Sequence, residues 1–225
     1  MGHIYIITGF YGSGKTEFCV NLAKNIATTS GEKVTIADLD VINPYFRSRE
    51  KEAHLAAYGI EVMGSALSNN TGQDLPAVSY AFLSRVVCGE NVIIDLAGGE
   101  AGVKLLAYCY DAIGKSKAPV DFLCVANLFR PETNSTDKIV SFVRKINAMS
   151  KLDITGLINN GHMLHDTTKE HLLMSQKAVV KAAKMLNIPF QYTQLRKDIY
   201  NKLADEIVSE KVLTFSKLTM REIWQ

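Results

Sequence analysis

Short apolar runs alternate with longer amphipathic segments along almost the whole chain. In runs such as NVIIDL at 91–96 and VDFLCVA at 120–126, most positions are apolar and apolar residues follow one another, rather than occupying every second position. This pattern is typical of strands that are buried on both faces, as they are in a parallel sheet covered by helices. The sequence therefore predicts a doubly wound, mostly parallel α/β sheet with helices on both faces, in three layers.

The elements can be placed from the same pattern. Strands are expected at 3–9, 33–40, 60–64, 91–99, 120–127, 153–160 and 188–195. Helices are expected at 16–31, 48–59, 74–87, 101–114, 131–149 and 167–186. No linker or repeat divides the chain, so a single domain is expected over 1–225. The tail from Lys197 is expected to be helical, with one face that packs on the core through Val212, Phe215, Leu218 and Ile223.

Composition narrows the function classes. The net charge is only +2 and Lys and Arg form no patch, which argues against nucleic-acid binding. No apolar stretch reaches the roughly 20 residues of a membrane span, and the N-terminus does not resemble a signal peptide, so a cytoplasmic protein is expected. The four cysteines form no CxxC pair and are expected to be buried apolar residues.

The first strand is followed by GFYGSGKT, which matches G-x-x-x-x-G-K-[ST] between a strand and a helix. Glycines let backbone N–H groups curl around phosphates, and the helix N-terminus adds positive charge. Lys15 is expected to contact the β- and γ-phosphates, and Thr16 to offer its hydroxyl to Mg²⁺. The predicted nucleotide-binding residues of this phosphate-binding loop (P-loop) are Gly9, Gly12, Ser13, Gly14, Lys15, Thr16 and Glu17.

Two further strand ends carry carboxylates. Asp38 and Asp40 end the second strand, and Asp95 ends the strand at 91–99, where Gly98 follows it. Sites in doubly wound sheets form beyond the carboxyl ends of the strands. Beside bound phosphates, such carboxylates can hold the hydration shell of Mg²⁺ or orient an attacking water. A backbone N–H at Gly98 could sense the γ-phosphate.

Together the P-loop, the DLD at 38–40 and the DLAGG at 95–99 resemble, in order and spacing, the MinD/ParA/NifH-like proteins of the CobQ/CobB/MinD/ParA group. The resemblance covers roughly residues 2–195 and implies a P-loop NTPase fold. It also implies that Asp40 orients the attacking water, that Asp38 supports the Mg²⁺ region, and that Asp95 is the Walker B aspartate.

In that family an asparagine after a later strand binds the base. GLINN at 156–160 offers Asn160 in this position, with Asn159 as the alternative. An amide can pair with the N6/N7 edge of adenine. The guanine-reading N-K-x-D motif is missing, so the resemblance favours ATP over GTP.

The P-loop also departs from the family. MinD-like proteins carry a lysine directly after the first glycine, which reaches the nucleotide of a partner subunit, whereas this chain has Phe10. Arg47 or Arg49 could supply positive charge instead, as an arginine finger does.

The expected function is a slow, Mg²⁺-dependent ATPase that acts as a nucleotide switch, with ATP and Mg²⁺ as cofactors and a protein partner or a second copy of the chain as reader. Use of the switch in cofactor maturation is one version of this. The alternative is a small-molecule kinase or an ATP-dependent ligase of the dethiobiotin-synthetase kind.

Overall fold

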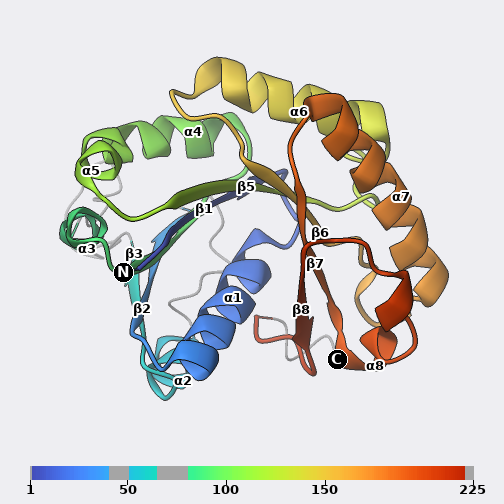
Figure 1. The fold of residues 1–225 in the computed structure, drawn as a ribbon, viewed down its shortest axis with the longest axis horizontal. Coiled ribbons are helices and arrows are strands. Elements are labelled where there is room, and N and C mark those ends of the chain that lie inside the picture. Colours follow the sequence, from blue (N-terminus) through green and yellow to red (C-terminus); the bar gives the residue numbers. More distant parts are fainter. Residues whose placement is uncertain (1, 41–50, 65–80, 221–225) are drawn as a thin grey trace, which may run out of the picture.

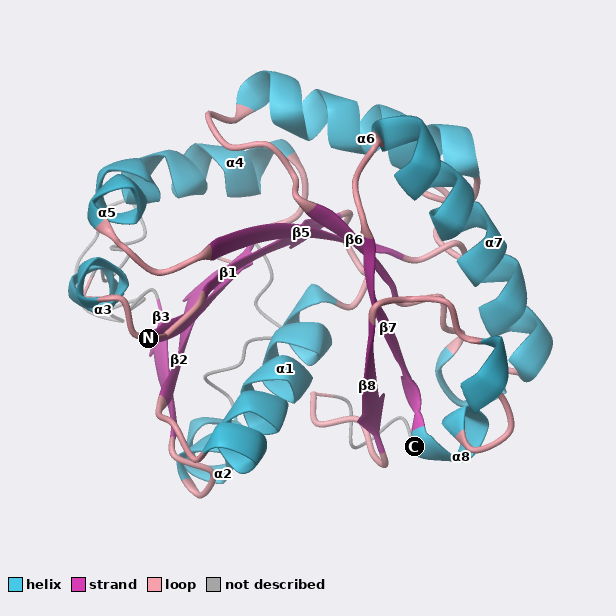
Figure 2. Ribbon diagram, viewed as in Figure 1, coloured by secondary structure: helices cyan, strands magenta, loops and turns pink. Residues whose placement is uncertain are grey.

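The computed structural model describes residues 2–40, 51–64 and 81–220 (Figure 1). Its centre is an eight-stranded sheet in the order β3-β2-β4-β1-β5-β6-β7-β8, and every neighbouring pair is parallel. The strands are β1 (Ile4–Gly9), β2 (Val34–Leu39), β3 (Ile60–Gly64), β4 (Asn91–Leu96), β5 (Val120–Ala126), β6 (Gly156–Asn159), β7 (Phe190–Arg196) and β8 (Lys211–Phe215). Figure 2 shows how strongly the sheet twists between β5 and β8.

Helices cover both faces of the sheet. They are α1 (Lys15–Ser30), α2 (Glu52–Ala56), α3 (Phe82–Cys88), α4 (Glu100–Leu106), α5 (Tyr110–Lys115), α6 (Thr136–Met149), α7 (Lys169–Leu186) and α8 (Lys197–Tyr200). In Figure 1, α1 and α2 lie below the sheet, α4 to α6 lie above it, and α7 lies to its right. The predicted three-layer α/β architecture is confirmed.

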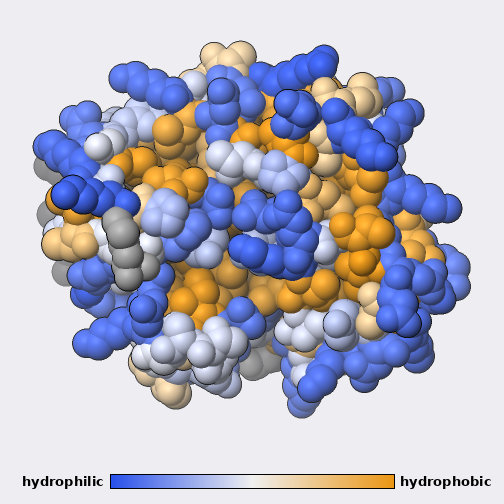
Figure 3. Space-filling model, in the orientation of Figure 1, coloured by the Kyte–Doolittle hydropathy of each residue, from blue (hydrophilic) through white to orange (hydrophobic). Residues whose placement is uncertain are grey.

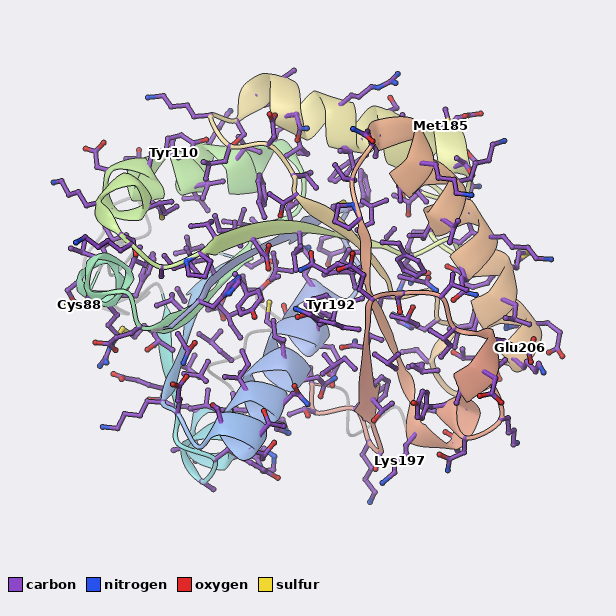
Figure 4. The ribbon with its side chains drawn as sticks, viewed as in Figure 1. Cys88, Tyr110, Met185, Tyr192, Lys197 and Glu206 are labelled. Atoms are coloured by element: carbon purple, nitrogen blue, oxygen red, sulfur yellow. The ribbon has the colours of Figure 1, made fainter. Side chains whose placement is uncertain are left out.

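Two apolar cores follow from this layering. Side chains at alternate strand positions face opposite sides, so Ile94 packs in the core under α3 to α7, and Ile93 packs in the core beside α1. On the α1 side, Phe18 meets Tyr192 of β7 edge-on, with ring centroids 5.5 Å apart. Figure 4 shows the side chain of Tyr192 beside α1. An aromatic pair of this geometry adds about 0.5–1.5 kcal/mol to the burial of its area.

All seven expected strands are present, but the prediction of a helical tail is wrong. After the single turn of α8, the chain forms β8, which pairs in parallel with β7. Val212 and Leu213 point to opposite faces of the sheet, Val212 towards α7 and α8 and Leu213 towards α1. Ile223 lies outside the described residues.

The surface differs from expectation at one cysteine. Figure 3 shows hydrophilic side chains around the rim of this face, with apolar surface in separate patches between them. Cys88 is exposed at the end of α3, contrary to the expectation that all four cysteines are buried, whereas Cys19, Cys109 and Cys124 are buried. No helix in the described part of the chain is long and apolar enough to cross a membrane.

Candidate nucleotide-binding site

The P-loop joins β1 to α1 at the carboxyl edge of the sheet. Gly12 and Gly14 have φ of 72° and 91°, in the left-handed region that favours glycine. A Cβ at Gly14 would lie 2.2 Å from Nδ2 of Asn160, so another part of the chain approaches the loop too closely for a side chain. The helix α1 begins at Lys15, which leaves the first backbone N–H groups of the helix available to an anion.

The polar side chains of the loop make few hydrogen bonds within the protein. Lys15 is buried, and its Nζ lies 3.4 Å from the carbonyl oxygen of Phe10. The buried hydroxyl of Ser13 has no hydrogen-bond partner among the described residues. Arg130, from the segment between β5 and α6, donates from Nε to the carbonyl oxygen of Gly12 at 2.9 Å. The sequence analysis did not identify Arg130, although it lies just beyond a strand end, where site residues are expected.

The two strand-end aspartates, Asp38 and Asp95, are neighbours. They are paired in the register of β2 and β4 and lie on the α1 side of the sheet. Asp95 is fully buried; Thr16 and Cys19 lie close to it, but no hydrogen bond of normal geometry reaches either carboxylate oxygen from the described residues. Burial, together with the charge of Asp38, raises the pKa of Asp95 to about 7, while Lys15 acts in the opposite direction.

This arrangement fits a divalent cation. Two adjacent buried carboxylates repel each other, and among the described residues the unpaired oxygens of Asp95 lack a positive partner other than Lys15. In the described residues no group of three or more His, Cys, Asp or Glu side chains could hold a metal by itself. A Mg²⁺ ion does not need one, since it is usually bound through one or two carboxylates, waters and substrate phosphates.

Asp40 and Gly98 lie beside the P-loop. Asp40 is buried, lines the pocket, and donates its backbone N–H to Oδ1 of Asp38 at 3.2 Å. Gly98 packs directly on the P-loop, because a Cβ there would lie 3.1 Å from the backbone nitrogen of Tyr11. The next residue, Gly99, donates its backbone N–H to the carbonyl oxygen of Gly9 at 3.4 Å. The segment after β4 therefore contacts the phosphate-binding loop itself.

A cavity of about 350 Å³ extends from the P-loop along the carboxyl ends of β6, β7 and β8. This volume is within the range of ligand pockets. Its wall beyond the phosphate end includes His162, Leu164, Leu172, Gln194, Arg196, Asp198, Ile199, Phe215, Lys217 and Met220. Most of these residues were not predicted; Gln194, Arg196 and Asp198 sit at or after the end of an expected strand, which was the available signal.

The two asparagines of GLINN have different surroundings. Asn160 lines the cavity, donates from Nδ2 to the carbonyl oxygen of Ser13 at 2.7 Å, and accepts at Oδ1 from Gln194 at 3.3 Å. Asn159 is fully buried, and its Oδ1 accepts from the hydroxyl of Ser175 in α7 at 2.6 Å. Of the two candidates for contact with the base, only Asn160 faces the pocket.

Glu17 was predicted to bind nucleotide, and the structure gives its carboxylate another partner. The oxygens of Glu17 accept from the backbone N–H groups of Thr219 and Met220, both at 2.9 Å. Nδ2 of Asn21 donates to the same carboxylate at 3.2 Å. Glu17 lines the cavity and at the same time fixes the segment after β8 across α1.

The two aromatic residues of the P-loop point in different directions. Phe10 packs edge-on against Phe142 of α6, with ring centroids 6.0 Å apart. Tyr11 is 58% exposed and lines the mouth of the cavity. Arg47 and Arg49, proposed from the sequence as sources of positive charge, lie outside the described residues.

Comparison with solved structures agrees with this fold. The chain is similar to the cell division protein FtsY from Thermotoga maritima, with a TM-score of 0.58, 22% identity, and coverage of 87% of this chain and 62% of that one. It is also similar to the signal recognition particle receptor FtsY from Elizabethkingia anophelis in complex with GDP, with a TM-score of 0.60, 18% identity, and coverage of 86% and 57%. The fold is that of a P-loop NTPase.

These likenesses concern the fold. The chain spans about three fifths of the length of the FtsY proteins it matches. No protein-family model matches the sequence, and no curated protein does. The coarse part of the sequence prediction, a P-loop NTPase fold, is confirmed, whereas the specific resemblance to MinD and ParA stays a prediction.

Proposed function

We propose that this protein binds ATP with Mg²⁺, hydrolyses it slowly, and acts as a nucleotide switch that a protein partner reads. One observation carries the proposal: the P-loop of Gly12 to Thr16 opens into a cavity beside buried carboxylates, and Asp95 has no hydrogen-bond partner among the described residues. A phosphate chain with its metal ion would satisfy both the N–H groups of the loop and the unpaired carboxylate.

The residues divide the chemistry between them. Lys15, now 3.4 Å from a loop carbonyl, would turn its ammonium group to the β- and γ-phosphates. Thr16 and Asp95 would hold Mg²⁺, with Asp38 orienting its waters, and the ion would neutralise the charge that develops on the phosphates. Asp40, buried at the cavity wall, would orient the attacking water.

The preference for ATP rests on Asn160. Its amide has two N–H donors and an oxygen with two lone pairs. One donor is used by Ser13 and one lone pair by Gln194, so one donor and one acceptor remain for a ligand in the cavity. That combination matches the N6/N7 edge of adenine, whereas guanine presents two acceptors there. One FtsY protein was solved with GDP, so the base has to be tested directly.

The switch proposal rests on Gly98, which packs against the backbone of Tyr11. A γ-phosphate in the P-loop would alter this contact, and the segment after β4 would change position with it. A protein partner that contacts this segment could then distinguish the triphosphate from the diphosphate state.

Calorimetric titration with Mg²⁺–ATP and Mg²⁺–GTP tests binding, and phosphate release tests hydrolysis. We expect ATP to bind more tightly, Lys15→Ala to abolish binding, and Asp40→Asn to bind ATP but lose most hydrolysis. Lys33→Ala, an exposed lysine ahead of β2, is the matched control and should behave as wild type. Hydrolysis at an enzyme-like rate with one small metabolite and no protein partner would instead support the kinase or ligase alternative.

A further inference from the structure

A chain of buried amide side chains connects helix α1 to the P-loop. Asn21 of α1 donates from Nδ2 to Oε1 of Gln194 at 3.4 Å, and Gln194 donates from Nε2 to Oδ1 of Asn160 at 3.3 Å. Asn160 then donates from Nδ2 to the carbonyl oxygen of Ser13 at 2.7 Å. All three amides are at least nine-tenths buried.

The two ends of this row of hydrogen-bonded amides determine the orientation of every amide in it. At one end, the Glu17 carboxylate accepts from Nδ2 of Asn21, and an ionised carboxylate can only accept. Asn21 must therefore present its nitrogen, so Gln194 must turn its oxygen to Asn21 and its nitrogen to Asn160. At the other end, the Ser13 carbonyl also only accepts, which agrees with the nitrogen of Asn160 facing it.

We propose that Gln194 determines the base specificity of this site by fixing the amide of Asn160, so that its one remaining donor and one remaining acceptor match adenine and not guanine. This inference rests on the proposed function and deepens it. Gln194 is a positioning residue here: it acts on the base through Asn160, and it is itself oriented by Asn21 and Glu17.

The physical reason is that an unconstrained amide discriminates poorly. Adenine offers an acceptor at N7 and a donor at N6, and guanine offers acceptors at N7 and O6. An amide whose oxygen is held in place by Gln194 meets O6 of guanine with an acceptor, which leaves both oxygens without a proton between them. Without Gln194, Oδ1 of Asn160 loses its donor, and only the hydrogen bond from Nδ2 to the Ser13 carbonyl holds the amide. A water can then enter beside Oδ1 and donate to O6 of guanine, so the penalty against guanine falls.

The test uses Mg²⁺–ADP and Mg²⁺–GDP, measured by calorimetry so that hydrolysis does not interfere. We expect the wild-type protein to bind ADP on the order of 10- to 100-fold more tightly than GDP. Gln194→Leu should reduce this ratio to within about threefold of unity, chiefly because GDP binds better relative to ADP. Asn21→Leu, which does not line the cavity, should lower the ratio in the same direction and serves as the second variant should Gln194→Leu fold poorly.

A matched control lies on the same strand. Gln191 is also buried in β7, but its amide donates to Asp121 at 3.1 Å, outside the cavity lining. Gln191→Leu should leave the ADP/GDP ratio unchanged. Asn160→Ala should abolish the preference, and Gln194→Leu added to Asn160→Ala should change the ratio no further, because Gln194 acts through Asn160.

The possible outcomes test the inference and the proposed function separately. Equal weakening of ADP and GDP by Gln194→Leu, with the ratio retained, would show a purely structural role and overturn the inference while leaving the function intact. A wild-type preference for GDP would also overturn the inference but leave a nucleotide-binding protein. Failure of the wild-type protein to bind either nucleotide would refute the proposed function itself.

Discussion

Removing the carboxylate of Glu17 should release the segment that follows β8. In the structure this carboxylate accepts two backbone hydrogen bonds, from Thr219 and Met220, at 2.9 Å each. Glu17→Ala removes both acceptors and leaves those two N–H groups to water. Hydrogen bonds to a charged group contribute about 1.5–3 kcal/mol each. Glu17 is half-buried, so the lower figure applies, and two bonds give about 3 kcal/mol.

Amide hydrogen exchange measures this directly. A loss of about 3 kcal/mol in local stability corresponds to exchange on the order of 100-fold faster at Thr219 and Met220. Amides of β4, in the centre of the sheet, should be unaffected. Glu52→Ala, which removes an exposed carboxylate from the first turn of α2, is the control for general helix effects. Unchanged exchange at Thr219 and Met220 in Glu17→Ala would refute the anchoring role.

Three further predictions concern the site and the fold. Arg130→Ala should weaken Mg²⁺–ADP binding by about 2- to 10-fold in calorimetry, because the P-loop loses a hydrogen bond, and Arg130→Lys should recover part of it; an unchanged affinity would contradict the contact. Asp95→Asn should raise the melting temperature of the nucleotide-free protein by roughly 2–8 °C, because the repulsion between the carboxylates of Asp95 and Asp38 disappears. The same variant should lose Mg²⁺-dependent hydrolysis. A lower melting temperature would contradict the repulsion. The hydrogen bond with His3 holds the pKa of Asp121 below its usual value, so this interaction stabilises the fold above about pH 4 and is lost as the pH falls through the lowered pKa. In urea titrations, the Asp121→Asn variant should therefore lose less stability on acidification than the wild-type protein. Equal losses in the two proteins would refute the assignment.

Local patterns were enough to predict the framework. The strands that are buried at every position, such as β4, were found because their sequences are mostly apolar, as expected of a central parallel strand with both faces covered. The P-loop was found because its glycines, Lys15 and Thr16 are contiguous in sequence. Asp38 and Asp95 were placed at one edge of the sheet by topology alone, since carboxyl ends of parallel strands share an edge.

The features that were missed depend on contacts between distant residues. Asn21 and Gln194 are 173 positions apart, and Glu17 and Thr219 are 202 positions apart. No local sequence pattern predicts a hydrogen bond between residues so far apart. Glu17 lies in the first turn of the helix after the P-loop, and this position alone suggested a role in the phosphate site. The strand β8 was taken for a helix because Val212 and Phe215 have helical spacing. Its pairing with β7 instead buries Leu213 on one face of the sheet and partly buries Val212 on the other.

The position of Phe10 bears on how the phosphates are neutralised. Its ring packs against Phe142 of α6, so the backbone at this position directs a side chain towards that helix and away from the cavity, whose lining includes Tyr11 instead. A lysine at position 10 would have to leave this packing before it could reach a second copy of the chain. Within one chain, by contrast, Lys15 and Arg130 already contact the P-loop. For a protein that binds nucleotide as proposed, this geometry favours charge neutralisation by cations of the same chain and by Mg²⁺ over delivery of a lysine across a dimer.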